Sequence, residues 1–240
     1  NTKVGTPQGG NLSPLLSNIM LNELDKELEA RGLNFVRYAD DCNIFVGSEK
    51  AANRVMESIK VFIEKKLGLK VNVEKSKVSR PQGIKFLGFG YYRTAKGEYR
   101  PKPHLKSMQK FKRKLKQLTN RSKSISLDKR IKDLNYLIRG WVNYFRIADM
   151  MKMVERVDKK IRARIRVIIW KQWKIPNKQI PSLVKLGIPL EEAKGLTFCR
   201  KGYQFIAHSC VIHRALSNAR LNKRGLVFTL DQYKKVHIKI

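Results

Sequence analysis

The sequence predicts an α+β fold, in which a small antiparallel sheet with helices precedes a mostly helical region. Three observations support this prediction. Apolar residues recur at helical spacing on both sides of two short β-prone runs, a tight turn separates those runs, and long amphipathic stretches fill the chain after residue 105. The chain has 240 residues, of which 42% are hydrophobic, so it can bury a real core. This composition excludes a disordered basic tail.

The first part of the chain alternates helices with β-prone runs. Ser13 followed by Pro14 is a typical helix start, and Gly32 ends the apolar helical pattern that follows. Two short runs around Asp40-Asp41-Cys42 are typical of a hairpin. In order, the pattern predicts a helix from Ser13 to Gly32, strands over 35–39 and 43–46, a helix over 51–67 and a strand over 69–78.

The second part of the chain is mainly helical. A turn at Gly97 and the prolines Pro101 and Pro103 indicate a boundary after the aromatic stretch 85–92. Narrow apolar stripes then alternate with basic side chains at helical spacing. The pattern predicts helices over 105–118, 127–145 and 150–173, and a mixed tail over 195–240.

Charge is spread unevenly along the chain. Residues 1–80 carry 13 basic and 10 acidic side chains, whereas residues 81–240 carry 39 and 9, within a net charge of +33. Because like charges repel in a compact state, this excess indicates a polyanionic partner. The basic residues are interleaved with aromatic ones over two thirds of the chain, a pattern that favours nucleic acid over a membrane surface.

The adjacent carboxylates Asp40 and Asp41 are the sharpest chemical feature. Two like charges at a hairpin tip cost stability unless something binds them. Their hard oxygen donors suit Mg²⁺, which takes one or two carboxylates together with substrate phosphates. Asp is also a common turn residue, so a structural turn is the alternative for an isolated Asp-Asp pair. The flanking apolar strands, the glycine-rich loop over 5–10 and the basic helices favour the metal.

The basic and aromatic side chains of the second part also allow two interpretations. Any single run, such as Lys112-Arg113-Lys114, can be a solvated helix face, but the total excess favours phosphate contacts. Trp141, Tyr144 and Phe145 recur at helical spacing, which favours core packing over base stacking.

Four stretches in a fixed order resemble motifs of reverse transcriptases. They are residues 5–14 (GTPQGGNLSP), 35–41 (FVRYADD), 69–77 (LKVNVEKSK) and 85–89 (KFLGF). Further downstream, four stretches are similar to the maturase-specific region of group II intron-encoded proteins. They are residues 134–145 (LNYLIRGWVNYF), 201–203 (KGY), 215–218 (ALSN) and 221–225 (LNKRG). The resemblance therefore covers nearly the whole chain.

The resemblance implies a partial right-hand polymerase palm followed by a mostly α-helical thumb and maturase domain. We expect a partial palm over 1–92, a linker and the start of the thumb over 93–122, and thumb and maturase-specific RNA-binding sequence over 123–240. The family's fingers and third catalytic carboxylate lie upstream of the loop at 5–14. We therefore expect the chain to be the C-terminal part of a longer polymerase and to be inactive in polymerisation alone.

The resemblance also assigns roles to individual residues. Asp40 and Asp41 would be catalytic and would hold Mg²⁺ in a two-metal site completed by a third carboxylate outside this chain. Gln8, Gly9, Tyr38 and Lys75 would contact nucleotide or template, with Lys77 as an alternative to Lys75, and Leu87 and Gly88 would support the primer end. The candidate RNA-binding side chains are Lys110, Lys112, Arg113, Lys114, Lys116, Arg139, Arg162, Arg164 and Arg166.

The implied activity is RNA-directed DNA polymerisation, a nucleotidyl transfer, combined with intron binding, splicing and mobility. The alternatives are a splicing maturase without polymerase activity and a reverse transcriptase of another retroelement. The expected partners are group II intron RNA, an RNA template, a DNA primer, deoxynucleoside triphosphates and target DNA, with no membrane and with a homodimer left open. Three scattered cysteines indicate a reduced setting, so we expect the bacterial cytoplasm, with an organelle as the alternative.

Overall fold

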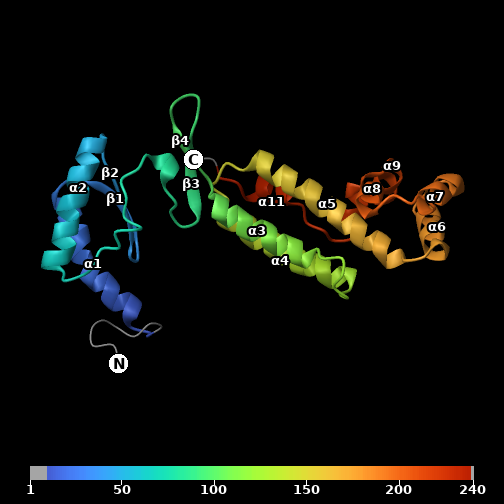
Figure 1. Cartoon of the computed structure of the whole chain (residues 1–240), viewed down its shortest axis with the longest axis horizontal. Helices are drawn as coiled ribbons and strands as arrows, with labels where there is room; N and C mark the ends of the chain where they lie inside the picture. The colour runs from blue at the N-terminus through green and yellow to red at the C-terminus, as the bar shows by residue number, and fades with distance from the viewer. Residues whose placement is uncertain (1–9, 239–240) are drawn as a thin grey trace. The chain divides into compact units, whose positions relative to one another are not determined.

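The computed structural model describes residues 10–238, and the chain divides into two compact units, Asn1–Phe86 and Leu87–Ile240 (Figure 1). We call them the hairpin unit and the helical unit. Both contain one two-stranded antiparallel sheet, and helices make up most of the rest. The predicted α+β class is therefore confirmed. In the described part of the chain, no helix is both long enough and apolar enough to span a membrane.

In the hairpin unit, two helices pack on one face of a hairpin. Strand alternation turns Phe35 and Ile44 toward the helices, where they pack on Leu24, Leu28 and Ile59. The elements are α1 (Ser13–Ala30), β1 (Asn34–Tyr38), β2 (Asp41–Phe45), α2 (Glu49–Val61), the π-helical turn η1 (Phe62–Lys66) and the 3-10 turn η2 (Pro81–Gly83).

Helix α2 shows how local sequence sets these elements. The Ser48 side chain accepts a hydrogen bond from the backbone N–H of Ala51 at 3.2 Å, so α2 begins with a side-chain cap. Apolar residues of α2 and η1, among them Val55, Ile59 and Ile63, then lie on the face that meets the hairpin.

The predicted strand over 69–78 is wrong. The segment contains a turn at 73–75, in which the backbone N–H groups of Lys75 and Ser76 donate to the carbonyl of Asn72 at 3.2 and 2.9 Å. Most side chains of this segment are exposed. The β-prone valines therefore have no packed surface to join, and the local asparagine turn prevails.

The helical unit begins with a hairpin, at the place where the sequence predicts a boundary. Strand β3 (Phe89–Arg93) pairs with β4 (Tyr99–Pro103), and Gly97 lies in the connecting turn with φ of 89°. Pro101 and Pro103 are tolerated because β4 is an edge strand of a two-stranded sheet.

Three long helices form the centre of the helical unit. They are α3 (Leu105–Leu118), α4 (Leu127–Tyr144) and α5 (Met151–Trp173), which confirms the three predicted helices to within one residue at each end. Their apolar stripes meet in one core, to which Phe111, Leu134, Ile138 and Ile165 contribute fully buried side chains.

Aromatic rings extend this core at the C-terminal end of α4. Trp141 stacks on Phe111 with ring centroids 4.3 Å apart, and Phe145 is buried against Phe89 and Trp141. Core packing is thus confirmed for Trp141 and Phe145. Tyr144 differs, because its ring is largely exposed while its edge contacts Phe145.

The tail folds into short helices that close the core. Asp158 of α5 is buried and accepts hydrogen bonds from the backbone N–H of Thr229 at 2.7 Å and of Leu230 at 2.9 Å, where α11 begins. Burial raises the pKa of Asp158, while the hydrogen bonds from Thr229 and Leu230 oppose that rise. The tail helices are α6 (Pro176–Lys185), α7 (Leu190–Thr197), α8 (Tyr203–His208), α9 (Cys210–Ala215), α10 (Asn218–Lys223) and α11 (Thr229–Val236).

Candidate active site

A strained turn carries the paired carboxylates. Tyr38 pairs with Asp41 in the hairpin register, so the loop between the strands contains only Ala39 and Asp40. Ala39 has φ of 52°, a left-handed conformation that residues with a Cβ rarely adopt. Such a conformation costs about 1–3 kcal/mol and persists only where the surroundings hold it. We call residues 39–41 the acidic turn.

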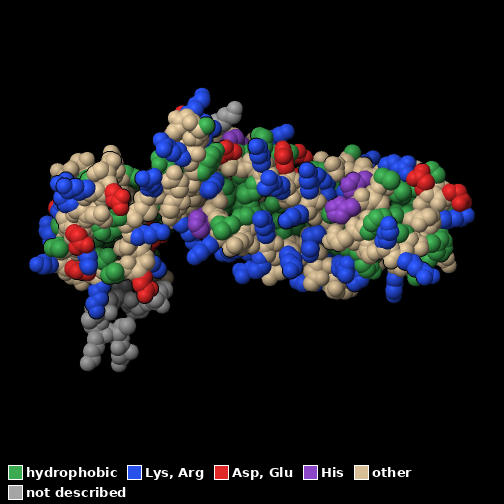
Figure 2. Space-filling model, turned by 45° about the horizontal axis from the view of Figure 1, so that its top comes forward, with side chains coloured by type: hydrophobic (Ala, Val, Ile, Leu, Met, Phe, Trp, Pro, Cys, Tyr) green, Lys and Arg blue, Asp and Glu red, His purple; other side chains and the backbone are tan. Residues whose placement is uncertain are grey.

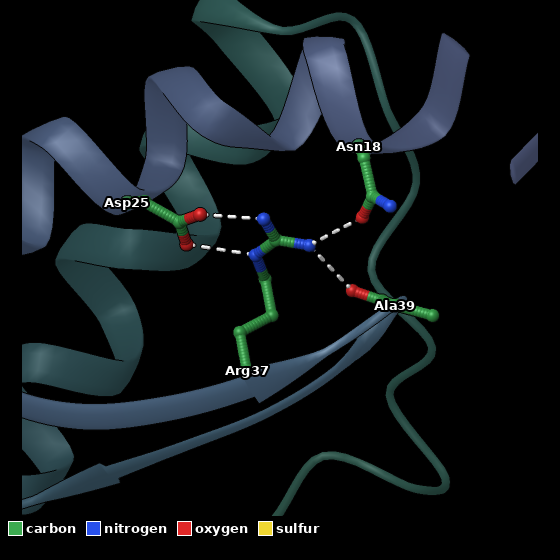
Figure 3. Close-up of polar contacts among 4 residues, drawn as sticks. All are labelled: Asn18, Asp25, Arg37 and Ala39. Atoms are coloured by element: carbon green, nitrogen blue, oxygen red, sulfur yellow. Dashed lines mark hydrogen bonds and ion pairs between the residues drawn. The ribbon is translucent and has the colours of Figure 1, made fainter. Parts of the chain in front are cut away.

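Arg37 holds the acidic turn from the inner side of the hairpin (Figure 3). Its guanidinium donates to both carboxylate oxygens of Asp25 on α1, at 2.7 and 2.5 Å. The remaining N–H group donates to Asn18 Oδ1 at 3.0 Å and to the carbonyl oxygen of Ala39 at 2.9 Å. Hydrogen bonding to Asp25 raises the pKa of Arg37 further. Because one planar group joins α1 to the strained residue, these contacts fix the backbone of the turn. We call these four residues the Arg37 brace.

The carboxylates themselves remain available for a ligand. Asp40 lies in the loop and Asp41 is the first residue of β2, and both are exposed. Within residues 10–238, neither side chain forms a hydrogen bond or an ion pair. Two consecutive carboxylates without partners among the described residues offer the oxygen ligands that Mg²⁺ takes together with substrate phosphates. The described residues contain no group of three or more His, Cys, Asp or Glu side chains suited to a metal.

None of the described residues covers the hairpin face opposite the helices. Alternation along the strands places Val36, Tyr38 and Phe45 on this face, and all three are exposed, Tyr38 to 62%. The phenol ring of Tyr38 is therefore the aromatic side chain paired in register with Asp41. On the covered face, burial raises the pKa of the Cys42 thiol to about 11. This thiol is thus kept protonated and unreactive.

The other predicted nucleotide-binding residues of this unit have different outcomes. Gln8 and Gly9 lie outside the described residues. Lys75 is exposed in the turn after Asn72, whose side-chain oxygen accepts a hydrogen bond from the Lys75 backbone at 3.1 Å. The structure thus leaves the ammonium group of Lys75 in solvent.

Leu87 and Gly88 form a second strained turn, in the helical unit. Their φ values are 48° and 80°. The hydroxyl of Tyr144 donates to the carbonyl of Leu87 at 2.8 Å, and the hydroxyl of Ser107 donates to the carbonyl of Gly88 at 2.9 Å. Gly88 suits this turn because its φ of 80° is one that residues with a Cβ rarely adopt, and a Cβ there would lie only 3.1 Å from the Ser107 hydroxyl oxygen. Side chains from two helices thus fix this backbone.

The structure divides the predicted RNA-binding side chains into two groups. An exposed group lies on α3 and α4 and is available to phosphates: Lys110, Lys112, Arg113, Lys114, Lys116 and Arg139. In the space-filling view, Lys and Arg side chains are spread widely over the α3 to α11 region, whereas acidic side chains form only a few small groups (Figure 2).

The second group lies on α5, and its side chains contact backbone carbonyls or a ring within the protein. Arg166 is 5% exposed and donates to the carbonyl of Leu216 at 3.1 Å, so its assignment to RNA is corrected here. Arg164 is half-buried and donates to the carbonyl of Thr119 at 3.1 Å, where it satisfies the end of α3. Arg162 is half-buried over the Phe228 ring, with its guanidinium carbon 5.4 Å from the centroid. These arginines are two residues apart, so on a helix they spread over a wide arc and some are expected to face the interior. The spacing does not tell which of them do.

The sequence does not reveal the residues that hold the two turns. Arg37 lies within the 35–41 motif, but no pattern assigns it a role, and none singles out Asp25 or Asn18. Strand alternation could have placed Arg37 on the helix-facing side, where a buried guanidinium needs a partner. Nothing in the sequence pointed to the contact of Tyr144 with Leu87.

Comparisons with known proteins agree with these features. The profile of the reverse transcriptase (RNA-dependent DNA polymerase) family matches residues 1–91, and the profile of the group II intron maturase-specific domain matches residues 108–182. Together the two matches cover the acidic turn and the three long helices.

Three curated relatives share parts of the sequence. Protein YkfC of Escherichia coli is 33% identical, with 35% of this chain and 31% of that protein covered. The COX1/OXI3 intron 2 protein of Saccharomyces cerevisiae is 29% identical, with shares of 37% and 17%. Group II intron-encoded protein LtrA of Lactococcus lactis is 29% identical, with shares of 37% and 26%. The chain thus covers less than a third of the length of each relative. These findings together show that the chain carries a reverse transcriptase domain followed by a group II intron maturase-specific domain, and that its relatives include a group II intron-encoded protein.

Proposed function

We propose that the protein is an RNA-directed DNA polymerase that also binds its group II intron RNA and assists splicing and mobility. The observation that carries this proposal is the acidic turn, which presents two carboxylates, without partners among the described residues, on a strained backbone held by the Arg37 brace. The family uses Mg²⁺ and binds intron RNA and other nucleic acids. The partners would be an RNA template, a DNA primer, deoxynucleoside triphosphates, the intron and target DNA.

Asp40 and Asp41 would hold Mg²⁺ as two of its ligands. The bound ion would stabilise the negative charge that develops on phosphate oxygens during nucleotidyl transfer. Tyr38, beside Asp41 in the register, offers a ring to a base or sugar on the uncovered face. Lys75 offers a solvated ammonium to nucleotide phosphates, and Gln8 and Gly9 would contribute on the template side. Rigid positioning by the Arg37 brace keeps the two carboxylates ready without reorganisation.

The turn at Leu87 and Gly88 would support the primer end. Its backbone is fixed by Tyr144 and Ser107, so the groups it presents to a primer do not have to be ordered on binding. The exposed basic side chains of α3 and α4 would contact phosphates of the intron. We assign residues 1–92 to the palm, 93–122 to the linker and start of the thumb, and 123–240 to the thumb and maturase region.

The test replaces both carboxylates, Asp40→Ala with Asp41→Ala, in the whole protein. We expect cDNA synthesis on a primed RNA template to fall by roughly 10³-fold or more, because the metal site is lost. Binding of intron RNA and splicing should persist. The matched control is Glu191→Ala with Glu192→Ala, which removes another adjacent carboxylate pair, on α7, and should leave cDNA synthesis unchanged.

The same experiment separates the alternatives. A whole protein that promotes splicing but makes no cDNA would be a splicing maturase without polymerase activity. A protein that makes cDNA but neither binds nor helps to splice its intron would be a reverse transcriptase of another retroelement. The relatives come from bacteria and a yeast, and we propose the bacterial cytoplasm or an organelle as the place of action.

A further inference from the structure

A third strained residue lies far along the chain from the two turns. In the described residues, Ala39, Leu87 and Lys174 are the non-glycine residues with positive φ. Lys174 follows α5 with φ of 60° and ψ of −58°, and the N–H of Ile175 donates to the carbonyl of Trp173 at 2.7 Å across it. This is a γ-turn of the rare, strained form. Because such strain clusters at functional sites, the surroundings of Lys174 are a candidate site.

Two neighbouring hollows lie around the end of α5. The first, of about 390 Å³, is lined by Lys171, Lys174, Lys201 and Tyr203. The second, of about 440 Å³, shares Lys171 and is otherwise lined mainly by the loop 121–126 between α3 and α4. No Asp or Glu lines either hollow in the described part of the protein. An anion that enters either hollow therefore meets basic side chains and no carboxylate that would repel it.

Arg121 joins the two hollows. It lines the second, and its guanidinium carbon lies 4.4 Å from the ring centroid of Tyr203, which lines the first. The two hollows thus share Lys171 and are linked by this contact. We call them together the basic groove, and its defining residues are Arg121, Lys123, Lys171, Lys174, Lys201 and Tyr203.

Exposed rings accompany the cations in a segment that lines the first hollow, with Tyr203 in the lining and Phe198 and Phe205 beside it in the sequence. In the segment 198–205, Phe198, Tyr203 and Phe205 are exposed to 66%, 37% and 48%. The ammonium nitrogen of Lys201 lies 4.2 Å from the centroid of the Phe205 ring. Cations that track a backbone, combined with rings on which bases stack, are the two elements of single-strand recognition.

Polar atoms without partners point to the same place. Among the described residues, the buried side-chain atoms that lack a hydrogen-bond partner are Arg130 Nε and Thr197 Oγ1. Thr197 belongs to the lining of the first hollow and Arg130 to that of the second. Folded proteins leave few such atoms unsatisfied, so the walls of the groove are incompletely satisfied in the free protein.

We propose that the basic groove binds a single-stranded segment of RNA, with phosphates on its lysines and arginines and bases stacked on Tyr203 and Phe205. The inference rests on the proposed function, because it names the form of RNA that the maturase region holds. Exposed rings can stack only on bases that are unpaired, whereas a paired A-form helix offers mainly phosphates and 2′-hydroxyls. The groove is thus suited to a loop or junction strand.

The experiment measures binding of a short, unstructured, fluorescein-labelled RNA to the whole protein over a series of salt concentrations. Lys171→Ala with Lys174→Ala should lower the salt slope by about 1.4, since each lost phosphate contact on a single strand removes about 0.7. Tyr203→Ala should weaken binding by roughly 10-fold, and Tyr203→Phe should restore it, because stacking requires the ring alone. Crosslinks from 4-thiouridine in the RNA should map to residues 198–205.

A matched control removes equal charge from the same helix outside the groove. Lys159→Ala with Lys160→Ala takes two exposed charges from α5 and should leave the slope unchanged. The proposal is overturned if both double variants act alike, if Tyr203→Ala binds as the unmodified protein does, or if duplex RNA competes as well as single-stranded RNA.

Assays of cDNA synthesis on a primed template keep the two proposals apart. If cDNA synthesis is normal and the groove variants bind single-stranded RNA as the unmodified protein does, only the proposal for the basic groove is overturned. Loss of groove binding in those variants, in a protein that makes no cDNA, would overturn the polymerase proposal and support the groove.

Discussion

The hairpin unit and the helical unit stabilise their candidate sites in different ways. In the described part of the hairpin unit, the buried apolar core consists of Leu24, Leu28 and Ile59, and one face of the hairpin is uncovered. The core of the helical unit runs continuously through α3, α4, α5 and the tail helices. The acidic turn thus depends on a few polar contacts, whereas the basic groove and the turn at Leu87 lie on a packed scaffold.

The use of arginine shows the same contrast. Arg37 connects α1 with the acidic turn, whose two carboxylates form no hydrogen bond or ion pair among residues 10–238. Arg130, Arg164 and Arg166 bind backbone carbonyls within the helical unit and so serve its architecture. A high positive charge therefore does not assign each arginine to RNA, because burial decides which of them remain available.

The largest difference should appear in amide hydrogen exchange. A two-stranded hairpin with a small core opens easily, whereas central helices exchange only by larger unfolding events. We expect amides of α4 around Ile138 to exchange on the order of 10³-fold more slowly than those of β1 and β2, measured by mass spectrometry. Equal protection in the two units would contradict the comparison.

The cysteines offer a second measure. Cys42 lies on the covered face of the hairpin, and its pKa is raised to about 11, whereas Cys210 in the helical unit is exposed. At pH 8 only about one Cys42 thiol in 10³ would be a thiolate, so alkylation by iodoacetamide should be roughly 10²-fold slower at Cys42 than at Cys210. Peptide mapping over time gives both rates. Comparable rates would mean that the hairpin face is less well covered than described.

The Arg37 brace should be visible in the kinetics of cDNA synthesis. Arg37→Ala frees the strained Ala39 carbonyl and leaves Asp25 unpaired, so we expect kcat to fall about 10-fold while KM for the primed template changes little. Arg37→Lys keeps the charge without the bidentate geometry and should recover only part of the rate.

Arg31→Ala is the control for this variant. Arg31 also pairs with a carboxylate, Glu27, and a hydroxyl, Ser58, in the hairpin unit, but it has no contact with the acidic turn. If Arg31→Ala reduced kcat as much as Arg37→Ala, a general loss of stability would explain both.

The smallest expected effect concerns His213 in the helical unit. Burial and the nearby Arg166 lower its pKa from the ordinary value of 6.5. Because the folded pKa is depressed, the stabilising contribution is present above pH 6.5 and is lost as pH falls through the folded pKa. Between pH 7 and 5, the Tm of the unmodified protein should therefore fall slightly more than the Tm of His213→Gln. The other charged groups near His213 are His208 and Arg162. A larger fall in the variant would reverse the assignment.

The sequence was informative where a periodic pattern and a buried face coincide. Helices α3, α4 and α5 follow from stripes such as Met108, Phe111 and Leu115, whose burial the structure confirms. The strand expected over 69–78 failed because β-propensity needs a packed neighbour, which the spacing of valines cannot reveal. The carboxylate pair was visible in the sequence, but its strained backbone was not, because the Ala39 carbonyl is held by Arg37, whose guanidinium is in turn held by Asp25 and Asn18 of α1.

The candidate site was least predictable where one side chain acts through another. The partnership of Arg37 with Asp25 spans 12 positions, and that of Tyr144 with Leu87 spans 57. Side chains that hold a turn from a distance leave no spacing signature. The basic groove is likewise built from three separate segments, whose proximity depends on the packing of the tail helices on α5.

The capping of α11 by Asp158 has a consequence for how the protein is made. Tyr233 donates a hydrogen bond to the carbonyl of Ala148, 85 positions earlier, and Thr229 meets Asp158 across 71 positions. During synthesis, α4 and α5 therefore leave the ribosome with an apolar seam that nothing covers until the last helix arrives. Until α11 has been synthesised, chaperones could bind this exposed apolar surface, and the folded surface that would bind RNA is not yet complete.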